Sequence, residues 1–220
     1  MGRGVGKVLD GLKLGETVLV EYEAYSSPEL FLAILQNYAL ERGKPVLIDD
    51  IVDTLPEYVE RLKLMGVDFQ RFTNVSVIKI GGSRESGNVV GHLEVDKYRL
   101  DFKYYDNIYK KVASREVINP VLGVYKLFGL FRKHELLRLA RNIASFVGRR
   151  SRVAYYFLNV EVVETISPEM LPLLEEASTT ILRWGREGRS YRLEVVKACD
   201  EDITGSSVVV GVGDIKEGKL

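Results

Sequence analysis

The sequence predicts one α/β domain, a three-layer fold in which helices flank a mainly parallel sheet that ends in an antiparallel hairpin. Strand and helix patterns alternate three times in about the first eighty residues, which is typical of parallel strands joined by helical crossovers. Residues 152–160 are almost entirely apolar, as expected of a strand buried on both faces. With 220 residues, the chain suits a single large domain spanning residues 1–220.

The first strand–helix unit follows a short glycine-rich lead-in. Residues 1–14 contain four glycines, which predicts a loose segment. Residues 17–21, Thr-Val-Leu-Val-Glu, have an apolar centre and predict a buried strand. Ser27 and Pro28 then open a helix, because Pro is favoured at the first helical position, and Gly43 is expected to end it.

Two further strands and a helix complete the first part of the predicted sheet. Residues 45–48 read as a second buried strand. Apolar residues then recur at helical spacing from Leu55 to Met65, and Gly66 is expected to end that helix. Residues 75–80 form the third predicted strand.

The middle of the chain allows more than one interpretation. Residues 83–91 suggest a loop with two glycines. Alternation over residues 93–105 suits a strand or hairpin, and a helix beginning near Asp101 is the alternative. The dipeptide at residues 119–120, Asn-Pro, is a turn signal.

The last third predicts two helices and three strands. A helix is expected over residues 134–147, followed by the apolar strand at residues 152–160. Pro168 is expected to start a second helix that runs to about Trp184. Residues 191–199 and 207–212 are expected to form the closing hairpin.

The composition excludes several classes of protein. Hydrophobic residues make up 46% and charged residues 28%, which are values of a folded globular protein. No run of eighteen apolar residues occurs and the N-terminus lacks an apolar signal core, so we expect a cytoplasmic protein without a membrane partner. Cys199 is the only cysteine, which excludes an intrachain disulfide and a cysteine-based zinc site. Few glutamines beside many charged residues favour a thermophilic source.

Charge is unevenly distributed although the net charge is zero. Residues 97–152 carry 14 Lys/Arg and 4 Asp/Glu, a net charge of +10, whereas each flanking segment carries −5. Interleaved aromatic and basic residues can hold single-stranded nucleic acid. The alternatives are an acidic partner or neighbouring copy, or solvated helix faces with half-buried tyrosines. The residues of this expected surface are Tyr104, Tyr105, Lys110, Lys111, Arg149, Arg150 and Arg152.

The turn after the first strand stands where a nucleotide-binding protein would hold phosphate, but its chemistry differs. A phosphate loop needs glycines, a Lys and a Ser or Thr in the pattern G-x-x-x-x-G-K-[ST]. Here Tyr22 and Ser27 replace the glycines, Pro28 replaces the Lys and Glu29 replaces the hydroxyl residue. A carboxylate in the first helical turn also puts negative charge where phosphate would bind. The altered loop comprises Tyr22, Glu23, Ala24, Tyr25, Ser26, Ser27, Pro28 and Glu29.

The order of these parts resembles the RecA/KaiC-like ATPase core. Gly15-Glu16 followed by a strand and a helix stands where that family has its phosphate loop, and Lys63-Leu-Met-Gly66-Val-Asp68 is similar to its R-x-x-G-x-D-L segment. The closing strands resemble the family's terminal hairpin. Asn159 lies where the resemblance places the Mg²⁺-directing Walker B aspartate, so that charge is lost. The chain also resembles a small archaeal family of unknown function that keeps this core without its active site.

The resemblance and the departures together imply a catalytically inactive ATPase homologue without a cofactor. We expect it to act as a protein-binding or regulatory module for a second copy, a related ATPase or an extended peptide on a sheet edge. The alternative is a nucleic-acid accessory protein using residues 97–152. Asp49, Asp50 and Asp53 follow the second strand and could bind Mg²⁺, or form a solvated turn and a helix N-cap. An enzyme using Glu23, Asp49 and Asp50 is the third reading.

Overall fold

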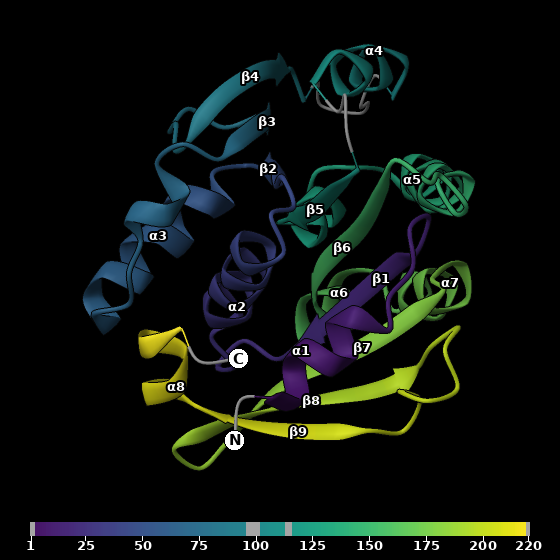
Figure 1. Cartoon of the computed structure of the whole chain (residues 1–220). Coiled ribbons are helices and arrows are strands. Elements are labelled where there is room, and N and C mark those ends of the chain that lie inside the picture. The colour runs from purple at the N-terminus through teal and green to yellow at the C-terminus, as the bar shows by residue number, and fades with distance from the viewer. Residues whose placement is uncertain (1–2, 96–101, 113–115, 219–220) are drawn as a thin grey trace.

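The computed structural model describes residues 3–95, 102–112 and 116–218, and it contains one nine-stranded sheet (Figure 1). Its strand order is β4-β3-β2-β5-β6-β1-β7-β8-β9. The first seven strands of this order are parallel, and β8 and β9 continue the sheet in antiparallel pairing. The strands are β1 (Thr17–Tyr22), β2 (Leu47–Ile51), β3 (Ser76–Ile80), β4 (Asn88–Leu93), β5 (Val117–Leu122), β6 (Arg152–Asn159), β7 (Thr180–Glu187), β8 (Ser190–Lys197) and β9 (Ser207–Gly211).

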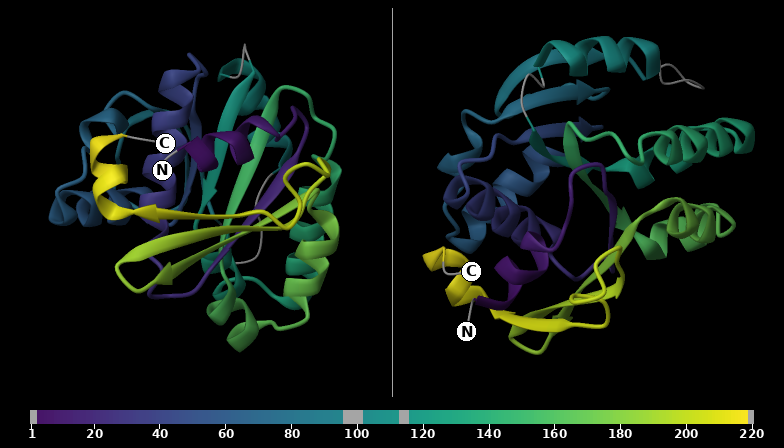
Figure 2. Two further views of the ribbon diagram at one scale, coloured as in Figure 1. Left: turned by 60° about the horizontal axis from the view of Figure 1, so that its bottom comes forward. Right: turned by 45° about the vertical axis from the view of Figure 1, so that its right-hand side comes forward.

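Helices cover both faces of the sheet, and each face has its own apolar core (Figure 2). One core includes apolar residues of α1, α2, α3 and α8, and the other includes those of α4, α5, α6 and α7. The expected mainly parallel α/β fold with a closing hairpin is therefore confirmed. The helices are α1 (Arg3–Asp10), α2 (Pro28–Glu41), α3 (Thr54–Met65), η1 (Gln70–Phe72), α4 (Phe102–Val112), η2 (Val124–Gly129), α5 (Lys133–Ser145), α6 (Val160–Ile166), α7 (Met170–Ala177) and α8 (Val212–Glu217).

Several predicted elements lie where the sequence patterns place them. Strand β1 and helix α2 match the expected first unit, with Pro28 at the helix start. Gly66 ends α3 in the left-handed conformation, with φ of 67°, that glycine adopts easily. Strand β6 is buried along its whole length, as its apolar run predicts. None of the helices in the described ranges is both long and apolar enough to cross a membrane.

Two predicted segments differ in the structure: the N-terminal lead-in and the helix expected after Pro168. Residues 3–10 form helix α1 instead of a loose lead-in, because Val5, Val8 and Leu9 share one buried face at helical spacing. The helix expected from Pro168 to Trp184 is wrong. Helix α7 ends at Ala177, and the apolar residues after it form strand β7, whose central position beside β1 overrides the helical reading.

The middle of the chain also differs. The loop expected over residues 83–91 ends early, because Asn88 starts edge strand β4. Helix α4 begins at Phe102, close to the alternative start near Asp101, so a strand running to residue 105 is wrong. Residues 96–101, which the strand or hairpin reading included, lie outside the described residues. Helix α5 buries Leu136, Leu139, Ala140 and Ile143, whereas Leu137 is exposed.

The dipeptide at residues 119–120 lies inside central strand β5, so the predicted turn is wrong. Pro120 has no N–H, and a proline in a central strand removes a bond from the ladder. In the parallel pairing, the N–H of Ile118 donates to the carbonyl of Pro45, which directs the next donor, at position 120, towards the carbonyl of Leu47. The side-chain amide of Asn119 donates to that carbonyl instead, at 2.7 Å. The Asn119 side chain thus replaces the hydrogen bond to β2 that Pro120 cannot make.

We expect Asn119→Ala to lower the free energy of unfolding by about 1–3 kcal/mol, because it leaves a buried carbonyl without its donor. Pro120→Val restores the backbone N–H, so Asn119→Ala should cost less in that background. Urea unfolding of the two single variants and the double variant measures this coupling. Strictly additive costs would show that the Asn119 amide does not replace the missing donor.

Candidate functional site

The candidate site lies at the carboxyl edge of the sheet, where β1 and β6 lie side by side. Strand β1 leads into α2 on one face, whereas β6 leads into α6 and α7 on the other face. Ligands of open α/β sheets bind in the crevice that such a reversal creates. The altered phosphate loop therefore stands at the expected position for a ligand, and its contacts decide whether phosphate can enter.

Inside this loop, protein groups engage the backbone that phosphate would need. The N–H of Ala24 donates to the carboxylate of Glu161, which follows β6, at 2.8 Å. The N–H of Ser26 donates to the carbonyl of Glu23 at 2.9 Å. Ser27 takes the left-handed conformation, with φ of 46°, and its carbonyl accepts from the Trp184 ring N–H at 3.3 Å. These contacts leave a folded turn where a phosphate loop would have a ring of free donors.

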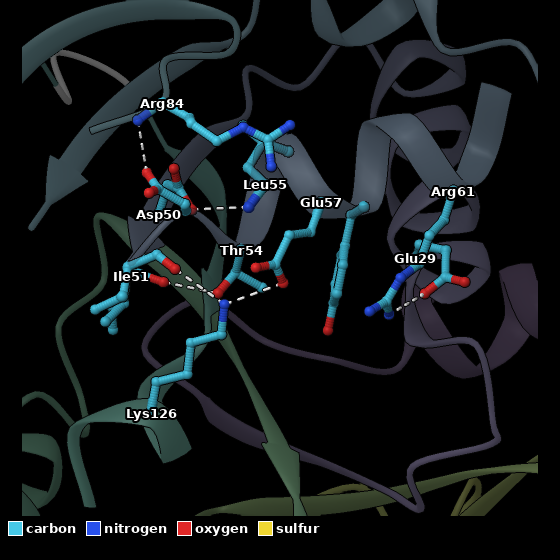
Figure 3. A network of polar contacts seen from close by, with 12 residues as sticks. Glu29, Asp50, Ile51, Thr54, Leu55, Glu57, Arg61, Arg84 and Lys126 are labelled. Carbon is cyan, nitrogen blue, oxygen red and sulfur yellow. Dashed lines mark hydrogen bonds and ion pairs between the residues drawn. The ribbon is translucent and has the colours of Figure 1, made fainter. Parts of the chain in front are cut away.

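A carboxylate also occupies the start of α2. Glu29 lies in the first turn of this helix and is 3% exposed. Its Oε2 lies 3.7 Å from Nη1 of Arg61 on α3. Figure 3 shows the two side chains facing each other. Burial raises the pKa of Glu29, although its own backbone N–H and Arg61 act in the opposite direction. The position that would attract a phosphate dianion is therefore filled by an acid with its own counter-ion.

Three tyrosines fill the space beside the turn. The hydroxyls of Tyr22 and Tyr58 lie 3.1 Å apart, and both side chains are buried. The ring of Tyr125 meets that of Tyr22 edge to face at 6.4 Å. Burial raises the pKa of each of these phenols. Tyr22 replaces the first glycine of a phosphate loop, so its ring takes up room that such a loop keeps open.

Asn159, the residue at the Walker B position, caps a helix. It is the N-cap of α6, and its side chain accepts a hydrogen bond from the N–H of Val162 at 3.2 Å. Asn is among the best N-cap residues, since its oxygen satisfies a free donor of the first turn. Asn159 therefore has a structural role, as the cap of α6.

The acidic residues after the second predicted strand are not a turn. Asp49 and Asp50 lie within β2 and are buried, because that strand starts and ends later than its apolar pattern predicts. Asp50 accepts from Nζ of Lys79 at 2.8 Å and from the N–H of Leu55 at 2.8 Å. It thus caps α3 through its side chain, the role that the sequence leaves open between three acids. Figure 3 shows Asp50 beside Leu55.

Asp53 belongs to a strained loop between β2 and α3. Val52 and Asp53 have φ of 48° and 59°, and with Ser27 they are the three non-glycine residues of positive φ in the described chain. Strain of this kind is concentrated at functional sites. The carboxylate of Asp53 accepts from Lys79 and from the N–H groups of Ser83 and Arg84. Partial burial opposes the shift, yet these donors lower the pKa of Asp53 to about 2.

A second lysine completes this loop from the side of η2. Nζ of Lys126 donates to the carbonyl of Val52 at 2.9 Å and to Glu57 at 3.1 Å. Thr54 donates to the carbonyl of Ile51 at 2.7 Å, and Figure 3 shows these contacts together. In the described ranges, no group of three or more His, Cys, Asp or Glu side chains is arranged to hold a metal. The sequence interpretation missed both lysines, although Lys79 lies one residue before the end of β3, which neighbours β2.

The expected basic and aromatic surface is partly buried. Tyr105 and Arg152 are 4% and 2% exposed, so their assignment to a binding surface is wrong. The Tyr105 hydroxyl donates to Asp49 at 2.7 Å, and Arg152 donates to that hydroxyl at 3.0 Å and to Asn119 at 2.6 Å. Burial raises the pKa of Asp49 to about 6 despite the nearby guanidinium.

The other members of this set lie nearer the surface. Arg149 and Lys110 both pair with Asp106, at 2.5 Å and 2.6 Å. Lys111 and Arg150 are exposed, whereas Tyr104 lies on α4 and its side chain is outside the described residues. The Tyr105 ring is part of the buried core, so its ring is not available on the surface, whereas the basic residues Lys111 and Arg150 are exposed.

Comparisons with known proteins place the chain in a family. A family model described as "Pyrococcus protein of unknown function, DUF257" matches residues 7–209. A solved structure from Pyrococcus horikoshii OT3, described only as a structural study, is 37% identical, with a TM-score of 0.84 over 92% of this chain and 96% of that one. No curated protein matches the sequence. The chain therefore belongs to the DUF257 family of Pyrococcus proteins of unknown function.

Proposed function

We propose that this protein is a RecA/KaiC-like ATPase homologue that has lost phosphate chemistry and works as a protein-binding or regulatory module. The buried carboxylate of Glu29 at the start of α2 carries the proposal, because it occupies the place where phosphate would meet the helix N-terminus. Pro28 supplies neither the N–H nor the ammonium of a phosphate loop. The position of the turn between β1 and α2, at the crevice beside β6, supports the RecA/KaiC-like reading.

The proposal predicts that Mg·ATP does not stabilise the protein. A ligand at about a hundred times its Kd should add roughly 2.7 kcal/mol to the free energy of unfolding. We expect no such change in thermal unfolding with millimolar Mg·ATP or Mg·ADP, with an active RecA-like ATPase as the positive control. Glu29→Gln removes the charge but leaves the three tyrosines in place, so we expect this variant not to bind Mg·ATP either. A clear stabilisation of the unaltered protein would contradict the proposal.

A protein partner is the stronger candidate for this module. Strands β4 and β9 are the two edges of the sheet, and Val209 of β9 is 46% exposed. An uncovered edge offers backbone donors and acceptors to an extended peptide or a second copy. Light scattering over a range of protein concentrations would reveal self-association. If the protein stays monomeric, the same edge is to be tested with peptides.

For the nucleic-acid alternative, the basic surface is present, but Tyr105 cannot stack on bases because it is buried. Lys111, Arg138, Arg141 and Arg150 are exposed, while Tyr105 is buried. Anisotropy with a labelled single strand at low and high salt separates the two functions. Binding by phosphate contacts should weaken steeply with salt, whereas the protein-binding proposal expects no binding at physiological salt.

A further inference from the structure

A cavity lies beside the altered phosphate loop, on the part of the sheet made by β1, β7 and β8. Its volume is about 360 Å³, and it lies between Glu21, the start of α6 at Val160, and the charged residues of β7 and β8. Cavities of this order hold small ligands. The protein-binding module proposed above does not use it.

Cross-strand register brings opposite charges together in this cavity. Glu21 of β1 lies beside Arg183 of β7, which in turn lies opposite Glu194 of β8. Two residues further along β7, Gly185 lies opposite Arg192. A Cβ placed on Gly185 would meet no atom within 4 Å, so this glycine leaves the space above the strand open. At Gly185 the floor of the cavity is therefore backbone without a side chain, next to the row formed by Glu21, Arg183 and Glu194.

The acid side of the cavity has an unsatisfied acceptor. Glu21 is 4% exposed, and its Oε2 accepts from Nε of Arg183 at 3.0 Å. Its Oε1 is buried and has no hydrogen-bond partner among the described residues. Burial raises the pKa of Glu21, and the neighbouring carboxyl of Glu175 raises it further while Arg183 opposes both. A buried acceptor without a donor is costly, so a ligand that donates an N–H is favoured.

The basic side of the cavity keeps donors in reserve. Arg183 and Arg186 donate through Nε, to Glu21 and to the carbonyl of Gly188, in the described part of the chain. The terminal nitrogens of both guanidinium groups take no part in these bonds. Arg192, by contrast, is used by Glu187 at 2.6 Å and by Ser207 at 2.7 Å. Free guanidinium nitrogens are suited to bind a carboxylate through two parallel hydrogen bonds.

We propose that this cavity binds a small zwitterion of amino-acid or dipeptide size, with its ammonium group at Glu21 and its carboxylate at Arg183 and Arg186. The two charges of such a ligand match the two sides of the cavity, whereas a molecule of one charge would leave one side unmatched. Val160, which lines the cavity at the start of α6, contacts the ligand between its charged ends.

Isothermal titration calorimetry with glycylglycine as the probe tests this site, with putrescine and succinate as ligands of one charge. We expect glycylglycine to bind at least tenfold more tightly than either, because charge-assisted hydrogen bonds form at both ends. Glu21→Gln should weaken binding at least tenfold, and Gly185→Leu should abolish it by filling the cavity. Glu201→Gln, on an exposed turn outside the cavity, is the matched control and should bind like the unaltered protein.

Circular dichroism establishes that each variant is folded, and Gly185→Leu is the safer variant because its new side chain enters open space. Three results would overturn the proposal. The first is no binding of glycylglycine to the unaltered protein. The second is equal binding by Gly185→Leu and the unaltered protein. The third is binding of Mg·ATP that Gly185→Leu abolishes, which would make the cavity a nucleotide site and would also contradict the proposed function.

Discussion

Replacing Lys79 with Met is expected to lower the free energy of unfolding by about 3–5 kcal/mol. The Lys79 side chain is 3% exposed, and its Nζ lies between the carboxylates of Asp50 and Asp53. Asp50 is equally buried, so removal of the ammonium leaves a negative charge in the interior without a counter-ion. Removing one partner of a buried pair costs far more than breaking a pair on the surface. Urea unfolding at pH 7 measures the loss.

Lys63→Met is the matched control for Lys79→Met. Lys63 pairs with Glu60 on the surface of α3 at 2.7 Å, and the change should cost less than about 1 kcal/mol. Asp50→Asn in the Lys79→Met background should recover part of the loss, because the amide oxygen still accepts from Leu55 without carrying a charge. Similar costs for Lys79→Met and Lys63→Met would show that the buried pair contributes no more than a surface pair.

Asp53 adds a pH dependence to the same cluster. Its pKa of about 2 in the folded protein lies below the ordinary value of 3.8. The folded state therefore holds the proton less tightly than the unfolded chain does. The stability that this group contributes is present above pH of about 4 and is lost as the pH falls through about 2.

Arg152→Met is expected to have a cost of the same size, about 3–5 kcal/mol, for a different reason. The guanidinium donates to the Tyr105 hydroxyl and to Asn119, and it lies 4.6 Å from the centre of the Phe146 ring. Met fills much of the volume but leaves these acceptors without a donor, and the buried carboxyl of Asp49 loses its nearest positive charge. Arg150→Met, on the exposed neighbour, is the control and should change stability by less than about 0.5 kcal/mol.

The pH dependence of unfolding separates the charge of Asp49 from packing. Its pKa is about 6 in the folded protein against 3.8 ordinarily, so the folded state binds the proton more tightly. Stability from this group is full below pH of about 4 and is lost as the pH rises through about 6, by about 3 kcal/mol. Asp49→Asn should remove this dependence, and Arg152→Met should move it to higher pH. An unchanged profile in Asp49→Asn would show that another group titrates.

The sequence predicts an element correctly where residues close together in the chain determine it. The apolar run of β6, the Ser27–Pro28 start of α2 and the glycine that ends α3 each follow from neighbouring residues. Prediction fails where a partner distant in the chain decides. The pattern of β7 predicts a helix, but pairing with β1 makes it a strand. The Asn-Pro dipeptide predicts a turn, but the Asn119 side chain supplies the donor that Pro120 lacks and keeps the segment in the sheet.

The candidate site shows the same division. The missing glycines and lysine of the phosphate turn are visible in the sequence, and so is the acid at Glu29. Lys79 could have been found, because it lies one residue before the end of β3, which neighbours β2, and carboxyl ends of parallel strands meet at one edge. The row formed by Glu21, Arg183 and Glu194 could not, since it depends on the register of three strands. Burial likewise separates Tyr105 and Arg152 from the exposed basic residues near them in the chain.

The central place of β1 has a consequence for synthesis of the chain. Both neighbours of this strand, β6 and β7, follow it in the chain by more than a hundred residues and are therefore made later. A ribosome adding about 5–20 residues per second needs roughly 8–30 s to pass from β1 to β7. Strand β6 is made before β7, so β1 lacks both neighbours until residues 152–159 are made and keeps one unpaired edge until residues 180–187 follow. The sheet can close only after that. A chain cut short before β7 would leave β1 as an open template for aggregation.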